Sequence, residues 1–444
     1  MSTAARTPNI VFIVADDLGY ADLGCYGGRD ADFGPVSPVL DGLAAKGIRF
    51  TQGYSNSPVC SPTRFAMITG RYQYRLRGAA EEPIRSDRGS ATLGLPPDHP
   101  TLPSLLKAGG YRTALIGKWH LGFPPHFGPL KSGYEEFFGP MSGGVDYFTH
   151  CDSRGNHDLW LGDGEHHETG GEAYLTDLLS DRAIDYVDRM AQQDAPFFLS
   201  LHYTAPHWPW ETREDADRAP VVRDNLFDLS GGNIHTYRRM VHHMDEGIGR
   251  LMAALERHGL ADDTLVVFTS DNGGERFSDS WPLVGGKMDL TEGGIRVPWI
   301  AHWPAVIAPG GVTPQPCLTM DWSATMLAAA GVAADAAYPL DGVSLLPVLR
   351  APGDTFSRPM HWRMNHRGQQ AMRDGDWKYL RVDGNDYLFD IRADERERAN
   401  LAHRSPERLV RMRAAWEAWN RTMPPIPPDA TVSLGYSVKD MPQR

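Results

Sequence analysis

The chain has 444 residues, of which 41% are apolar and 23% are charged, as is usual for a soluble globular protein. This length is sufficient for one large domain with a smaller one beside it. The formal net charge of −12 argues against nucleic acid or an anionic membrane as a general partner, and it mildly disfavours a long polyanionic glycan, while leaving room for a local anion pocket.

The cysteines and the N-terminal segment indicate in which cellular compartment the protein is expected. The four cysteines show no paired short spacing, which argues against a disulfide framework or a zinc knuckle and fits a reducing compartment. The apolar run at residues 10–15 is too short for a secretory signal, and no stretch approaches the length of a membrane span. We therefore expect a cytoplasmic protein without a membrane partner.

Two predicted strands end in oxygen-bearing side chains. Residues 9–14 form an unbroken apolar run, typical of a strand buried on both faces, and Asp16 and Asp17 follow it. Residues 264–270 repeat the pattern and lead into Asp271 and Asn272. Ligands of open α/β sheets bind beyond the carboxyl ends of the strands, so we expect these four side chains to meet. Such a set favours a hard cation, Ca²⁺ or Mg²⁺, over Zn²⁺; the alternative for Asp16 and Asp17 is a solvated turn.

The segment at residues 58–70 predicts a helix with an anion-binding start. Pro62 suits the first turn, and Cys60 is expected just before the N-terminus, where backbone N–H groups favour negative charge. Arg64 adds a positive charge one turn later. The residues alone leave two interpretations open: a nucleophilic thiolate of low pKa, or a small buried apolar side chain.

Residues 38–47 and 101–108 read as short helices that end at glycine, and a strand is predicted at residues 111–120. In an extended strand Lys118 and His120 would point to the same face. A solvated lysine and a hydrogen-bonded core histidine are the alternative for this pair.

Two loops follow. Residues 143–150 form an aromatic segment opened by glycines, for which a packed aromatic corner is one interpretation. Residues 162–171 are polar and glycine-rich; His166 and His167 there could bind adventitious metal, but a surface loop is favoured.

The middle of the chain alternates helix and strand. Residues 172–190 and 237–257 show helical spacing of apolar side chains, and the strand at 197–203 ends just before His207. A single histidine is more often structural than catalytic, yet His207 stands at another strand exit between proline and tryptophan. Glycines around Lys287 permit close backbone approach to an anion.

The last third completes the predicted layout. Glu292 and Arg296 are expected to form a structural ion pair, and residues 321–330 a helix ended by glycine. Residues 351–359 indicate a boundary between a large N-terminal domain, 1–355, and a C-terminal α+β subdomain, 356–444. The subdomain is predicted to contain short strands, a helix at 406–422 and an extended tail from Pro424 that lies along the surface.

Two motifs resemble signatures of the sulfatase family, within the alkaline phosphatase superfamily. Cys60-Ser61-Pro62-Thr63-Arg64 with Met67-Ile68-Thr69-Gly70 resembles the first, and residues 110–120 resemble the second. The similarity runs from Pro8 to about Leu401. It implies an α/β fold with a large central mixed, mostly parallel sheet flanked by helices, plus the small C-terminal α+β domain with a short antiparallel sheet.

The resemblance also implies a mechanism. Cys60 would be oxidised to formylglycine by a formylglycine-generating maturation enzyme, and one hydroxyl of its hydrate would attack the sulfur of a sulfate ester. The organic alcohol would leave, and the second hydroxyl would lose a proton to expel sulfate and restore the aldehyde. The implied metal ligands, for Ca²⁺ or Mg²⁺, are Asp16, Asp17, Asp271, Asn272 and residue 60.

The remaining roles also come from the family. Arg64, Lys118 and Lys287 would neutralise the sulfate oxygens, His120 would help to hold the sulfate and the hydrate, and His207 would face the leaving oxygen. The residues considered for substrate binding are Asp146, Tyr147, His150, Trp208, Arg276 and Trp281.

The predicted partner is a small-molecule sulfate ester, aryl or sugar, and an oligomer is possible. The nearest alternative is a phosphonate or phosphate ester hydrolase that uses the same site. A non-catalytic anion-binding protein would have no use for two candidate acid–base histidines, and a thiol-based hydrolase would leave the metal ligands unexplained.

Overall fold

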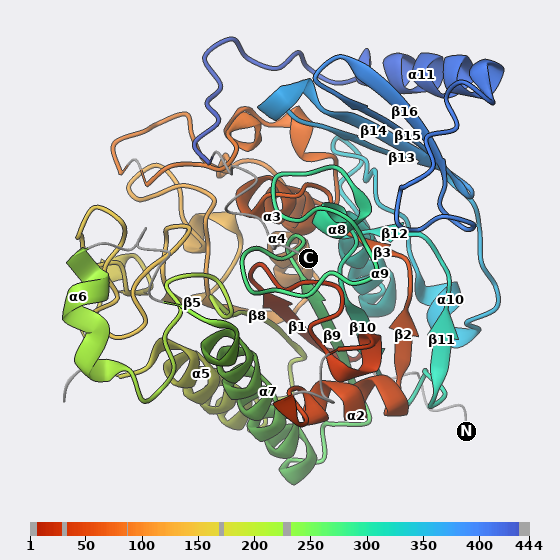
Figure 1. Ribbon diagram of the computed structural model, residues 1–444. Helices are drawn as coiled ribbons and strands as arrows, with labels where there is room; N and C mark the ends of the chain where they lie inside the picture. The colour runs from red at the N-terminus through yellow and green to blue at the C-terminus, as the bar shows by residue number, and fades with distance from the viewer. Residues whose placement is uncertain (1–6, 29–32, 87, 168–172, 225–231, 435–444) are drawn as a thin grey trace, which may run out of the picture.

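The computed structural model describes residues 7–28, 33–86, 88–167, 173–224 and 232–434. Its main feature is a ten-stranded mixed sheet through the middle of the molecule (Figure 1). Across the sheet the strands are β11 (Gly311–Thr313), β2 (Ile48–Phe50), β10 (Trp299–His302), β9 (Thr264–Ser270), β1 (Asn9–Ala15), β8 (Phe197–His202), β4 (Arg112–Gly117), β5 (Glu136–Gly139), β6 (Trp160–Leu161) and β7 (Gly164–Glu165).

The centre of this sheet is parallel. β1 pairs in parallel with β9 on one side and β8 on the other, and β4 and β5 continue in parallel beyond β8. β10 runs antiparallel between β9 and β2, and β6 and β7 add an antiparallel edge. The prediction of a mixed, mostly parallel sheet is confirmed. Because β1, β4, β8 and β9 share one direction, the loops that follow them emerge at the same edge.

Helices cover both faces, which explains the unbroken apolar sequence of β1. Val11 and Ile13 pack into the cluster under α5 and α7, whereas Ile10 and Phe12 face the cluster under α3, α4 and α9. Figure 1 shows α2, α5 and α7 together on one side of the sheet. The helices of these two layers are α2 (Pro38–Lys46), α5 (Leu175–Met190), α7 (Ile234–Arg257), α3 (Cys60–Thr69), α4 (Leu102–Ala108) and α9 (Met320–Ala330).

Shorter elements connect these layers. β3 (Gly53–Tyr54) and β12 (Cys317–Leu318) form a two-stranded sheet of their own. The other short helices are η1 (Gly24–Tyr26), η2 (Gln73–Arg75), η3 (Arg77–Ala80), η4 (Leu130–Ser132), η5 (Ala216–Arg218), α6 (Ala219–Asp224), α8 (Glu292–Ile295), α10 (Leu346–Arg350) and η6 (His366–Gly368).

A four-stranded antiparallel sheet follows at the C-terminal end, as predicted. Its strands are β13 (Met360–Arg363), β14 (Gln370–Asp374), β15 (Trp377–Val382) and β16 (Asn385–Asp390), and α11 (Pro406–Asn420) packs against it (Figure 1). Buried Trp362 on β13 shares an apolar cluster with Val59 and Cys60. This sheet therefore packs directly behind the segment that carries the candidate nucleophile, and the division at residue 355 stays a prediction.

Three local predictions need correction. β4 ends at Gly117, so Lys118 and His120 follow the strand and do not share one of its faces. Gly117 has φ +116°, and a Cβ there would lie 1.8 Å from the His202 carbonyl oxygen, so the strands approach too closely for a side chain. His120 itself has φ +58°.

Helix α7 begins at Ile234, earlier than its apolar spacing predicted. Asn233 caps it, with Oδ1 accepting from the backbone N–H groups of His235 and Thr236 at 2.9 and 3.0 Å. α5 begins at Leu175, later than the predicted start at residue 172, which lies outside the described residues.

The C-terminal tail does more than lie along the surface. Val432 forms a parallel bridge with Glu82, and the Ser433 N–H donates to the Glu82 carbonyl at 3.0 Å. The tail thus reaches the segment that follows η3, which is next to the strand-end edge of the main sheet.

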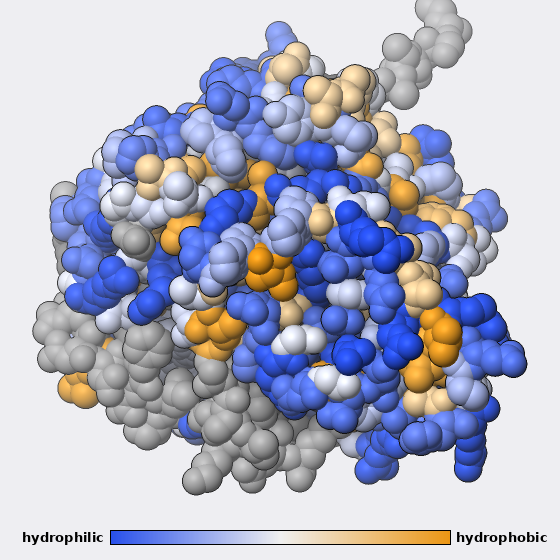
Figure 2. Space-filling view, turned by 90° about the horizontal axis from the view of Figure 1, so that it is seen from above, coloured by the Kyte–Doolittle hydropathy of each residue, from blue (hydrophilic) through white to orange (hydrophobic). Residues whose placement is uncertain are grey.

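The outer surface matches the composition. In the part of the chain that the structure describes, no helix combines the length and apolarity needed to cross a membrane. Figure 2 shows a mostly hydrophilic face on which apolar side chains form separate small groups.

Candidate active site

The loops after the parallel strands are joined backbone to backbone. The Asp271 N–H donates to the Ala15 carbonyl at 3.2 Å, and the Asp16 N–H donates to that of Ala205 at 3.1 Å. The Lys118 N–H in turn donates to the His202 carbonyl at 2.8 Å. The ends of β9, β1, β8 and β4 are therefore held side by side, as the sequence predicted for the first two.

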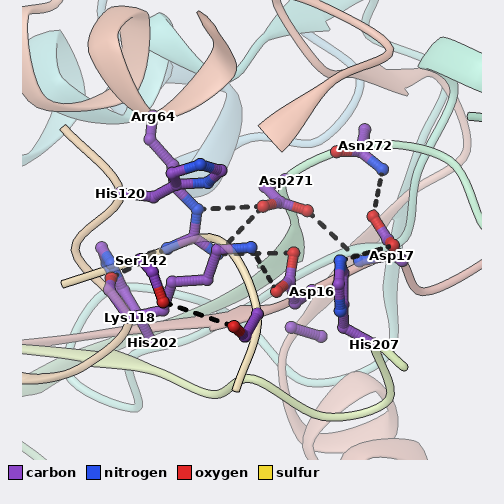
Figure 3. Close-up of polar contacts among 12 residues, drawn as sticks. Asp16, Asp17, Arg64, Lys118, His120, Ser142, His202, His207, Asp271 and Asn272 are labelled. Carbon is purple, nitrogen blue, oxygen red and sulfur yellow. Dashed lines mark hydrogen bonds and ion pairs between the residues drawn. The ribbon is translucent and has the colours of Figure 1, made fainter. Parts of the chain in front are cut away.

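Each of the three carboxylates at this edge has a buried cation, and Figure 3 labels two of these cations, Arg64 and Lys118. Arg64 Nε donates to Asp271 Oδ2 at 3.0 Å, and Lys118 Nζ donates to Asp16 Oδ2 at 2.5 Å. Lys287 Nζ donates to Asp17 Oδ2 at 2.6 Å and also approaches Glu275 at 3.4 Å. Buried charges are tolerated only when they are paired in this way.

The electrostatics of the two adjacent aspartates differ. Burial and the nearby Asp271 raise the pKa of Asp16 well above its usual value, against the opposing effect of Lys118. Burial also acts to raise the pKa of Asp17, but Lys287 and His207 outweigh it and hold that pKa below the usual value. Three carboxylates so close together repel one another, and additional positive charge would stabilise them.

The donor set fits a hard divalent cation. Buried Asp16 Oδ1 and Asn272 Oδ1 accept no hydrogen bond from any described residue. Asn272 Nδ2 donates to Asp17 Oδ1 at 2.7 Å, which aligns the amide with the aspartates. Carboxylate and amide oxygens are ligands of Ca²⁺ and Mg²⁺, so these residues could hold either ion.

His207 lies at the margin of the same cluster. Its Nε2 is 3.6 Å from Asp17 Oδ2, and ligand atoms of Asp16, Asp17 and His207 lie within 4.8 Å of one another. Imidazole is a poorer ligand than oxygen for a hard cation. The oxygen atoms are therefore the better candidates for metal ligands, and His207 is a candidate for proton transfer.

Cys60 lies beside this cluster, as expected from the sequence. It is the first residue of α3, with Val59 as the N-cap, and Pro62 lies in the first turn. The side chain is 2% exposed and lines a pocket of about 310 Å³ together with His120, His207 and Lys287. A reactive group at this position would meet a ligand and both histidines at once.

The structure disfavours one of the two interpretations left open for Cys60, the thiolate of low pKa. Burial raises the pKa of the Cys60 thiol to about 11, against the opposing effects of Lys118 and Lys287, so the unmodified thiol is protonated at neutral pH. The burial of the side chain in an apolar cluster with Val59 and Trp362 fits the second interpretation. The charges of Lys118 and Lys287 also act on it, so the position joins the apolar cluster to the charged site.

Two backbone contacts hold the Lys287 segment in place, one to the segment before Cys60 and one to the loop after β9. The Met288 N–H donates to the Pro58 carbonyl at 2.9 Å, and the Lys287 N–H donates to that of Gly274 at 3.0 Å. The Thr63 hydroxyl donates to the Ser57 carbonyl at 2.8 Å and fixes the approach to α3. These contacts place the glycine-flanked Lys287 on the pocket wall.

The hydrogen bonds of the two histidines define their tautomers, because a carbonyl only accepts. His120 Nε2 is 2.9 Å from the Ile84 carbonyl, and His207 Nδ1 is 2.5 Å from that of Trp208. The unprotonated nitrogens are therefore Nδ1 of His120 and Nε2 of His207. Burial, with Lys118 near His120 and Lys287 near His207, lowers both pKa values well below the usual range, so both rings are neutral at pH 7.

Arg64 and Lys118 act behind the pocket. Arg64 Nη1 donates to the Lys118 carbonyl at 3.0 Å and is 3.4 Å from His202 Nδ1, and neither Arg64 nor Lys118 is among the described residues that line the pocket. Arg64 and Lys118 neutralise the buried carboxylates of Asp271 and Asp16, and they affect the pocket only through these carboxylates. Glu292 and Arg296 form the expected ion pair at 3.7 Å.

Of the six residues considered for substrate binding, Trp208 lies on the pocket wall. Asp146 is buried and accepts from the Phe148 N–H at 2.9 Å, and the Tyr147 hydroxyl donates to the His207 carbonyl at 2.9 Å. His150 is also buried, 3.1 Å from the Ala173 carbonyl. These three shape the loop, whose Gly143 and Gly144 form the wall instead.

The last two of the six lie away from the wall. Arg276 is half-buried, and Trp281 is 52% exposed with the Arg396 guanidinium 4.1 Å from the centroid of its ring. Neither is among the described pocket-lining residues.

Several residues of the pocket were missed from the sequence. Arg85, Arg154 and the tail residues Ser433 and Leu434 line it. No local pattern marks them, since they stand in irregular segments far apart in the chain. The need for glycine at position 143 is visible only in the structure, because a Cβ there would lie 2.4 Å from His120 Cε1.

The adventitious metal binding considered for His166 and His167, against which a surface loop was favoured, has a possible ligand group for one of them. His167 stands with His157 and Glu165, with ligand atoms within 4.8 Å of one another, whereas His166 packs edge-on against Phe138. Arg88 already binds Glu165 at 2.8 Å.

Comparison with known proteins gives a consistent result. The family model described as Sulfatase matches residues 8–332. Human N-acetylgalactosamine-6-sulfatase is 34% identical over 393 residues, covering 84% of this chain and 70% of the relative. Human arylsulfatase A is 34% identical over 417 residues, covering 84% of this chain and 75% of the relative. The solved structure of Ps i-CgsB in complex with k-i-k-neocarrahexaose superposes with a TM-score of 0.83 at 32% identity, covering 98% of this chain and 96% of that one.

Proposed function

Because this chain belongs to the sulfatase family, we propose that it hydrolyses sulfate monoesters through a formylglycine formed at Cys60, beside a divalent cation held by the carboxylate cluster. As a family member it is a sulfuric ester hydrolase. The observation that supports the finer proposal is the convergence of Cys60, His120, His207 and Lys287 on one pocket directly beside Asp16 and Asp17.

The residues of this chain meet the two requirements of sulfate ester hydrolysis. Negative charge on the sulfate oxygens must be balanced, and buried Lys287 on the pocket wall can donate to them. The leaving oxygen must receive a proton, and neutral His207 or His120 could pass one on after accepting it, through its unprotonated ring nitrogen, from the attacking hydroxyl.

The proposed cofactors supply what these side chains lack. A bound divalent cation would provide Lewis-acid charge next to the sulfate, held by Asp16, Asp17, Asp271 and Asn272. A formylglycine hydrate would provide a hydroxyl nucleophile that can release sulfate again, whereas a thiol would be trapped as a thiosulfate ester. Ca²⁺ is the proposed ion, with Mg²⁺ as the alternative.

The substrate is proposed to be an aryl or sugar sulfate. Trp208 on the pocket wall offers an aromatic face for either ring. Both curated relatives named above are sulfatases, which does not favour the phosphate or phosphonate ester alternative.

The test combines chemistry on residue 60 with turnover. Mass spectrometry of the peptide around residue 60 should show the loss of sulfur for oxygen, and the converted fraction should scale with 4-nitrophenyl sulfate turnover. Cys60→Ser should react at most once per molecule. Steady multiple turnover by Cys60→Ser, or full activity in unconverted protein, would contradict the formylglycine mechanism.

A further inference from the structure

The pocket above Cys60 has a charge that is opposite to that of the whole protein. The chain carries a net charge of −12, yet none of the described residues that line this pocket is an aspartate or a glutamate. The lining instead includes Arg85, Arg154 and Lys287. A cation-lined recess in an acidic molecule creates a local positive field for an anionic ligand.

The two arginines differ from Lys287 in depth and in partners. Lys287 is buried and paired with Asp17, whereas the side chains of Arg85 and Arg154 are exposed at the outer part of the pocket. Neither arginine forms an ion pair with a described residue, in contrast to nearby Arg88, which binds Glu165 at 2.8 Å. Their guanidinium groups are therefore available to a ligand.

The backbones that carry these arginines are anchored. The Ile84 N–H, next to Arg85, donates to the Ser61 hydroxyl at 2.9 Å, and the Ile84 carbonyl binds His120 at 2.9 Å. The Arg154 N–H donates to buried Asp152 Oδ1 at 2.9 Å. The backbone that carries each arginine is thus held in place by hydrogen bonds beside the candidate reaction centre.

We propose that Arg85 and Arg154 form a second anion subsite, so that the preferred substrate is a sulfate ester carrying an additional carboxylate or sulfate group. This inference rests on the proposed function, which places the reacting sulfate at Cys60 and Lys287. The second anion would then lie toward the mouth of the pocket, where guanidinium groups bind planar oxyanions in bidentate fashion. Trp208 lies on the same wall and would contact the ring between the two anions.

The experiment compares matched aryl sulfates. The 2-, 3- and 4-carboxyphenyl sulfates are assayed beside the corresponding carbamoylphenyl sulfates, which have the same shape without the charge. Sulfate release by the wild type is compared with Arg85→Gln, Arg154→Gln and the control Arg411→Gln, an exposed α11 arginine without an ion pair to a described residue. Leaving-group effects cancel because variants are compared on the same substrate.

We expect each pocket variant to lose about tenfold in kcat/KM on at least one carboxylated isomer and less than about twofold on its carboxamide. Arg411→Gln should change neither. Equal losses of kcat/KM on the carboxylate and the carboxamide of every pair would mean that the arginines act only through a general electrostatic field, and would contradict a second subsite. The absence of any loss on the carboxylated substrates would also overturn the proposal.

A binding measurement separates this inference from the proposed function. Cys60→Ala should bind a carboxylated aryl sulfate more tightly than its carboxamide, and should lose that difference when Arg85 or Arg154 is replaced. If the wild type released no sulfate from any compound, the proposed function would fail, while calorimetry on Cys60→Ala would still decide the anion subsite. Equal affinity for both members of every pair would overturn it.

Discussion

Asp16 shows how single residues at this site depend on charge balance. Its Oδ2 accepts from Lys118, and its buried Oδ1 accepts no hydrogen bond from a described residue. Asp16→Ala would leave the Lys118 ammonium buried without this carboxylate and remove one proposed metal ligand. We expect loss of both Ca²⁺ binding, measured by calorimetry, and sulfate ester turnover.

The control is Asp376→Ala, which removes a half-exposed carboxylate in the turn between β14 and β15. It should retain turnover and Ca²⁺ binding. Undiminished activity of the wild type after chelation would show that the carboxylate cluster does not hold a required metal.

Glu211 gives a prediction about pH. Burial, and then the neighbouring Asp146, raise its pKa from 4.5 to about 9, so the folded protein holds a proton that the unfolded chain releases. The stability contributed by this proton is complete below pH 4.5 and is lost as the pH rises toward 9. The slope is at most about 1.4 kcal/mol per pH unit.

Glu211→Gln keeps a hydrogen-bond donor but cannot ionise. The difference in melting temperature between Glu211→Gln and the wild type should therefore increase in favour of the variant as the pH is raised from 5 to 9, in thermal scans at fixed ionic strength. The exposed residue Glu407, changed to Gln, serves as the control. A constant difference between Glu211→Gln and wild type across this range would refute the assignment.

At the scale of elements, the C-terminal tail is tied to the pocket through Glu81. The Thr431 N–H donates to Glu81 Oε2 at 3.1 Å, its hydroxyl donates to the same oxygen, and its carbonyl accepts from the Glu82 N–H at 3.0 Å. Two residues later the tail lines the pocket with Ser433 and Leu434.

Thr431→Val removes a donor from this buried carboxylate, which should weaken the local attachment by about 1–3 kcal/mol. We expect KM for an aryl sulfate to rise severalfold with little change in kcat, because the wall moves and the catalytic groups do not. Thr355→Val, at an exposed position, should leave both unchanged. An unaltered KM for Thr431→Val would show that the tail does not shape the pocket.

At the scale of the whole molecule, Trp362 joins three parts. Its Nε1 donates to the Ser55 carbonyl at 2.8 Å, its carbonyl accepts from Trp416 at 2.9 Å, and its ring lies 5.7 Å from that of Tyr54. The Trp362 side chain therefore joins the C-terminal sheet to the segment before α3, and its backbone carbonyl binds α11.

Trp362→Ala should cost about 3–5 kcal/mol of unfolding free energy and lower a single shared transition in denaturant. Trp377→Ala, in the same sheet but less buried, should cost less. Two separate transitions in the wild type would show instead that the C-terminal sheet unfolds independently.

The sequence was sufficient to predict those helices and strands in which the pattern of apolar side chains reflects which faces are buried. The apolar run of β1 identified a strand covered on both faces, and the apolar stripe of α7 identified a helix packed on one. Asp16, Asp17, Asp271 and Asn272 could be expected to meet because parallel strands place their carboxyl ends at one edge.

Only the tertiary structure decided which irregular segments complete the pocket. Arg85, Arg154 and Leu434 come together from distant parts of the chain, and the left-handed backbone at His120 turns this ring toward Ile84 after β4 has ended. Periodicity reports whether a residue is buried, but not which residue it contacts. Partners in loops are set by the packing of the elements that carry them, so the charge of the pocket emerges only when those elements are assembled.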